Sequence, residues 1–127
     1  MATFKKHQTV YFASTNFCRK QNRPPVRVNG VWTSDDTEYY AVVERVVDAC
    51  GARQMTFFDR NGMDSVFGRR QHTGAPVFAT ADEAFAYLET VAARNRAHPT
   101  PTYTTTYTIL RRVRPDYAPD FADLEAA

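Results

Sequence analysis

The chain has 127 residues, of which 43% are hydrophobic and 13% aromatic, and its formal net charge is +2. This length suits one compact domain with one core, and the hydrophobic fraction excludes general disorder. No apolar run approaches the roughly 20 residues of a membrane-spanning helix, and residues 1–14 lack the apolar region of a signal peptide. We therefore expect a cytoplasmic protein with no membrane partner.

Charge is distributed unevenly along the sequence. Residues 1–33 carry six Lys or Arg and no acid, whereas residues 34–50 hold five acids and only Arg45 as a base. The last thirteen residues hold four acids and no base. This segregation predicts interaction surfaces of opposite sign.

The first third of the chain is predicted to contain a strand, a loop and a turn. Residues 3–13 alternate between apolar and polar side chains, which favours a strand. Residues 14–25 are polar and basic and end in two prolines, so they predict a long loop. Asn29 and Gly30 tolerate positive φ and lie between valines, which indicates a short hairpin over residues 26–32.

Two helices are predicted. The first spans about residues 35–50, because Ser34 or Asp35 can cap it, residues from Tyr39 to Cys50 form an apolar stripe and Gly51 follows as a C-terminal cap. The second follows a short strand at residues 76–79. It begins after Thr80, with Glu83 three residues later in a capping box, and its apolar residues recur at helical spacing up to residue 92.

The remaining segments predict strands. Residues 53–59 and 63–69 are expected to pair around a turn at residues 59–62, and residues 101–113 alternate cleanly. The resulting order of elements, β-(ββ)-α-β-β-β-α-β, predicts a single α+β domain over residues 1–114. We expect a mostly antiparallel sheet of four to six strands with two helices on one face, followed by an acidic and aromatic C-terminal tail over residues 115–127.

The sequence offers little for catalysis or metal binding. His7, His72 and His98 lie far apart with no second ligand at helical spacing, so we expect no metal site. No glycine-rich phosphate loop is present, and we expect no cofactor and no catalytic activity. Cys18 and Cys50 are expected to be reduced, with one disulfide as the alternative. An enzyme that uses Cys18, with a pKa lowered by its basic surroundings, is a further hypothesis.

Two groups of residues are candidates for partner binding. Clustered cations beside an aromatic ring are typical of phosphate-binding surfaces. The tail places apolar side chains at i, i+4 and i+7 among acids, a pattern that either docks into a partner groove or folds back onto its own domain. The predicted basic patch consists of Phe17, Arg19, Lys20, Arg23, Arg27, Arg69, Arg70, Arg111, Arg112 and Arg114, and the predicted tail anchors are Tyr117, Phe121 and Leu124.

We therefore predict a small non-catalytic binding or inhibitor-type protein that masks a surface of a protein or nucleoprotein partner. In style the chain resembles phage and mobile-element accessory proteins, which include inhibitors of host nucleoprotein defence complexes. The alternative is a nucleic-acid-binding module that uses residues 17–27 and 111–114. A homodimer formed by strand pairing also stays open.

Overall fold

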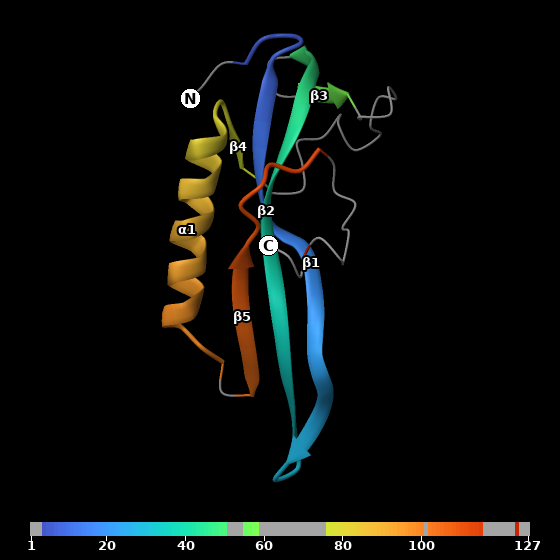
Figure 1. Cartoon of the computed structure of the whole chain (residues 1–127), viewed down its shortest axis with the longest axis vertical. Helices are drawn as coiled ribbons and strands as arrows, with labels where there is room; N and C mark the ends of the chain where they lie inside the picture. Colours follow the sequence, from blue (N-terminus) through green and yellow to red (C-terminus); the bar gives the residue numbers. More distant parts are fainter. Residues whose placement is uncertain (1–3, 51–54, 59–75, 101, 116–123, 125–127) are drawn as a thin grey trace.

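The computed structural model describes residues 4–50, 55–58, 76–100, 102–115 and 124 (Figure 1). In these ranges the elements are β1 (Thr9–Val28), β2 (Val31–Cys50), β3 (Met55–Phe58), β4 (Val77–Phe78), α1 (Ala81–Ala97) and β5 (Tyr103–Ile109). The chain is therefore an α+β domain. No helix among the described residues is long and apolar enough to cross a membrane.

Strand β2 is the centre of the sheet. It pairs antiparallel with β1 along one edge, and its other edge is shared by β3, which is antiparallel, and β5, which is parallel. β4 adds a short antiparallel pairing to β1 at Tyr11 and Phe12. The parallel pairing arises because the chain crosses through α1 before it returns as β5. The sheet is thus mixed.

The predicted helix over residues 35–50 is wrong, because these residues belong to β2. Tyr39, Ala41 and Val43 pack into one hydrophobic cluster, and Tyr40 and Val42 pack into a second one. A strand buried on both faces reads as a continuous apolar run, and such a run contains the i, i+4 pairs of a helical stripe. The valines and tyrosines of this segment favour a strand intrinsically, and pairing with three other strands satisfies that preference.

The predicted loop over residues 14–25 is also wrong, because β1 runs through it to Val28. The pairing of β1 with β2 shows register shifts between Ser14 and Cys18, between Gln21 and Arg23, and between Arg23 and Val26. Bulges of this kind accommodate surplus residues and proline without ending the strand. The Asn29-Gly30 turn is confirmed, with φ of 51° and 79°, but the strands that it joins are far longer than predicted.

The second predicted helix is confirmed as α1. The Thr80 hydroxyl accepts a hydrogen bond from the Glu83 backbone N–H at 3.3 Å and donates one to the Glu83 carboxylate at 2.9 Å. Two acids occupy the first turn and two arginines the last, as the helix dipole favours. The predicted strands at 53–59, 76–79 and 101–113 contain β3, β4 and β5. The predicted strand at 63–69 and its turn lie outside the described residues.

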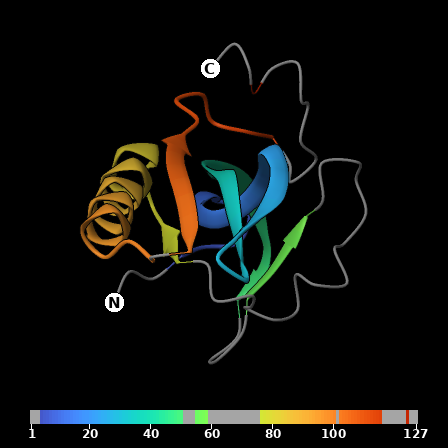
Figure 2. The same cartoon turned by 90° about the horizontal axis from the view of Figure 1, so that it is seen from below.

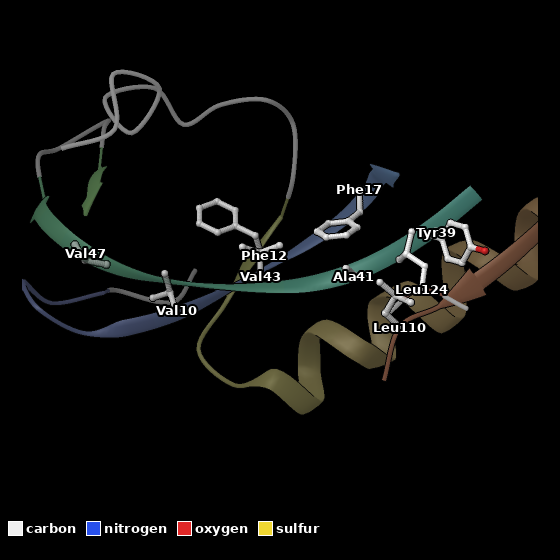
Figure 3. Close-up of a cluster of buried hydrophobic side chains, with 9 residues drawn as sticks. All are labelled: Val10, Phe12, Phe17, Tyr39, Ala41, Val43, Val47, Leu110 and Leu124. Atoms are coloured by element: carbon white, nitrogen blue, oxygen red, sulfur yellow. The ribbon is translucent and has the colours of Figure 1, made fainter. Parts of the chain in front are cut away.

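Two hydrophobic clusters hold the sheet. On one face α1 packs its buried Ala84, Leu88, Val91 and Ala92 against residues of β1, β2 and β5, and Figure 2 shows the helix flanking the sheet on the β5 side. The other cluster, drawn in Figure 3, contains Val10, Phe12, Phe17, Tyr39, Ala41, Val43, Val47, Leu110 and Leu124. Leu124 is only 3% exposed, so this residue of the predicted tail is part of the chain's own core.

Candidate functional site

The β1–β2 hairpin projects from one end of the molecule. Figure 1 shows it reaching past the end of α1 and past the start of β5. β5 pairs with β2 only from Ser34 onward, and every residue from 21 to 32 is exposed. We refer to residues 19–38 as the hairpin arm and to residues 26–33 as the hairpin tip.

The basic strand of the hairpin arm faces an acidic strand. Arg19 donates two hydrogen bonds to the Asp36 carboxylate, from Nε at 3.1 Å and Nη2 at 2.8 Å, and its Nη1 lies 3.9 Å from Glu38. Further along the arm, Arg23 Nε lies 3.5 Å from the Asp35 carboxylate. The positive and negative segments of the sequence therefore meet across the hairpin, and much of the segregated charge is neutralised within the arm.

The tip differs from the rest of the arm because its exposed side chains are mostly apolar. Among the described residues, the exposed large hydrophobic side chains are Val26, Val28, Val31, Trp32 and Tyr103. Trp32 is 60% exposed. Four of the five belong to the tip, and Tyr103 begins the strand that pairs with β2 next to it. These apolar side chains are thus gathered at one end of the molecule.

The register assigns these residues to two faces. Val26 pairs with Thr33 and Val28 with Val31, so the three valines lie on one face of the tip. Arg27 pairs with Trp32 on the other face. Tyr103 shares this second face, because it pairs with Ser34 and alternate residues of a strand point to the same side.

The members of the predicted basic patch that the structure describes do not form a single exposed surface. Phe17 and Arg114 are 7% and 6% exposed, and the Arg114 guanidinium lies 5.5 Å from the centre of the Phe17 ring, a cation–π contact inside the domain. Arg111 forms a salt bridge with Glu89 of α1, and Arg112 is exposed. Lys20 is half-buried and pairs with Thr37. Arg69, Arg70, Tyr117 and Phe121 lie outside the described residues.

Sequence reasoning missed the apolar members of the tip. The predictions placed residues 26–32 in a short hairpin and Tyr103 in a strand over residues 101–113, but gave none of these apolar side chains a role in binding. The available signal was the run from Pro24 to Thr33, in which Arg27 is the single charged residue. Such a composition around a turn indicates a projecting surface only when the strands are known to extend beyond the core.

Two other titratable side chains, Tyr40 and Cys18, lie in or against the hydrophobic core. Burial raises the pKa of Tyr40 above 10.0, although the hydrogen bond from Asn95 works in the opposite direction. That bond, from Asn95 Nδ2 to the Tyr40 hydroxyl at 2.8 Å, ties α1 to β2. Cys18 is a free thiol that packs against the cluster around Phe17. Within the described residues, no group of three His, Cys, Asp or Glu side chains is placed to hold a metal ion.

Comparisons of the chain with protein-family models, with curated proteins and with solved structures found no match.

Proposed function

We propose that the protein is a non-catalytic binding protein that masks a surface of a protein or nucleoprotein partner, and that the hairpin tip makes the contact. The observation that supports this proposal is the concentration of exposed large hydrophobic side chains at the tip and at adjacent Tyr103. Isolated exposed apolar residues are ordinary, but a group of them at a projecting end is typical of an interaction site.

The energetics favour covering this end. Val26, Val28 and Val31 are about half exposed, at 50%, 50% and 47%, so each leaves about 1 kcal/mol of burial free energy unused. Trp32 leaves a larger burial free energy unused, because an indole side chain buries a larger area than a valine side chain does. A partner that covers these four side chains gains this free energy without any rearrangement of the core.

Recognition by side chains at the tip is favoured over the addition of a partner strand. Within the described residues, β4 covers the outer edge of β1 only near Tyr11 and Phe12. Farther along, that edge carries Pro24 and Pro25, several register shifts and four cations. Prolines, bulges and charges are the features with which edge strands resist pairing. The same reasoning disfavours a dimer built by pairing of this edge.

A protein surface also suits the arm better than nucleic acid alone. The four cations of the arm share it with Asp35, Asp36 and Glu38, and ion pairs join Arg19 and Arg23 to these carboxylates. Phosphate groups would have to approach three negative charges. Phe17, the aromatic ring predicted to stack on bases, is buried. Masking a surface, as an inhibitor does, requires only affinity for the partner, and burial of the exposed apolar side chains of the tip would provide that affinity.

The proposal is tested by capturing partners from a lysate of the cells in which the protein occurs, with and without nuclease. The tagged chain is compared with Trp32→Ala and Val28→Asp, which alter the tip, and with Lys6→Ala, an exposed residue shortly before Thr9, where β1 begins at the end opposite the tip. We expect a nuclease-resistant protein partner that the wild type and Lys6→Ala retain and the tip variants lose. Retention by both tip variants would contradict the proposal, and so would binding that nuclease abolishes in every variant.

A further inference from the structure

We infer that the hairpin tip recognises an apolar pocket on a protein, with a carboxylate at the pocket's rim. In this arrangement Trp32 enters the pocket and Arg27 pairs with the carboxylate. This inference deepens the proposed function and rests on it. It follows from the register of the hairpin and from the cost of burying a charge.

The register of the arm separates Arg27 from the other arginines. Arg19 and Arg23 face β2 carboxylates and form ion pairs with them. Arg27 instead faces Trp32. No carboxylate of the described part of the chain lies within salt-bridge distance of the Arg27 guanidinium. The cation nearest the turn is therefore the one placed beside an exposed aromatic ring.

The need for a carboxylate on the partner follows from this placement. Cross-strand neighbours on one face have Cβ atoms about 4.5–5.5 Å apart, so burying the Trp32 ring brings the Arg27 guanidinium to the same interface. A desolvated cation without a partner is strongly unfavourable. Because Arg27 is the single charged residue between Pro24 and Ser34, the tip cannot supply the counter-charge within that stretch. The partner must supply it.

The composition and stiffness of this face suit a binding hot spot. Trp32, Arg27 and Tyr103 represent the three residue types most enriched in such hot spots. The turn at Asn29-Gly30 has the positive φ values of a twisted two-residue hairpin, and the Thr33 hydroxyl donates to the Val26 carbonyl at 2.9 Å. The tip is thus held in shape before it binds, which lowers the entropic cost of association.

Other apolar or charged partners fit less well. An anionic lipid surface and a nucleic acid would both bring negative charge toward Asp35, Asp36 and Glu38, which lie directly behind the tip in sequence and on β2. A protein pocket with a single acid at its rim approaches only the tip. It contacts Arg27 and Trp32 near the turn, whereas Asp36 and Glu38 lie farther along β2 on the same face, where both pair with Arg19.

The first step of the test locates the contact. Tyr103 is replaced by p-benzoylphenylalanine, an aromatic photocrosslinker on the same face as Trp32, and the crosslinked species from lysate are identified by mass spectrometry. We expect a protein segment with apolar residues and an Asp or Glu. Crosslinks to nucleic acid, to lipid or to a second copy of this chain would overturn the inference.

The second step tests the charge pair with the purified partner. Arg27→Glu should weaken binding about 30-fold or more, whereas Lys6→Glu, which changes the net charge equally, should not. Replacing the crosslinked acid of the partner by Arg should raise the affinity for Arg27→Glu at least tenfold. If tip variants lose the partner but this exchange restores nothing, the inference fails while the proposed function stands. If Trp32→Ala and Val28→Asp keep the partner, the proposed function fails as well.

Discussion

Replacing Leu124 by alanine should destabilise the domain, because its side chain lies in the core. Leu124 is 3% exposed and belongs to the cluster that includes Phe17, Tyr39 and Leu110. Truncating a buried leucine removes its transfer free energy and leaves a cavity, which together cost about 2–5 kcal/mol. The loss is a large fraction of the roughly 5–15 kcal/mol that stabilises a typical domain.

Urea unfolding followed by circular dichroism measures this loss. Leu88→Ala, at a fully buried position of α1, provides a reference for a core truncation. Val28→Ala, at a position that is 50% exposed, should change the free energy of unfolding by less than about 0.5 kcal/mol. If Leu124→Ala matched Val28→Ala in stability but lost partner capture, Leu124 would be a partner anchor and the reasoning would be refuted.

Three further predictions concern the contacts that hold the fold. Thr80→Ala should lower the free energy of unfolding in urea by about 1 kcal/mol because the helix cap is lost, and Thr80→Ser should keep most of the stabilisation by the cap. An unfolding midpoint for Thr80→Ala equal to that of the wild type would contradict the capping role. Because the folded-state pKa of Tyr40 is raised above 10.0, its contribution to stability is fully present below pH 10 and is lost as pH rises through that pKa. Tyr40→Phe should therefore lose less stability than the wild type between pH 9 and 11, and an equal loss would show that Tyr40 does not carry the effect. A double-mutant cycle on Arg19 and Asp36 should give a coupling of about 1 kcal/mol, because the Arg19 side chain is 56% exposed although the Asp36 side chain is only 11% exposed; a coupling well above that value would mean that burial of Asp36 outweighs the exposure of Arg19.

The helix α1 was predictable because its signals are local. Thr80 and Glu83 cap it through contacts three residues apart, and its buried residues follow one helical stripe. The turn at Asn29-Gly30 was predictable for the same reason, since positive φ is a property of those two residues. Local chemistry decides both features.

The long hairpin was not predictable, because its evidence is non-local. Asp35 and Glu38 have the spacing of a helix cap, and only the pairing with β1 shows that Asp35 faces Arg23 and Glu38 faces Arg19. Pro24 and Pro25 indicate a loop by local rules, yet bulges keep them within a strand. The binding surface was missed in consequence: Trp32 is recognisable as exposed only once the arm is seen to extend beyond the core.

The most direct test of the central claim compares partner affinity with stability for the tip. Trp32→Ala, Val28→Asp and the control Lys6→Ala are measured for thermal unfolding and for binding to the captured partner by isothermal titration calorimetry. The account predicts that all three keep a melting temperature close to that of the wild type, and that the two tip variants bind at least tenfold more weakly while Lys6→Ala binds normally. Wild-type affinity in both tip variants would contradict the claim that the hairpin tip is the binding surface.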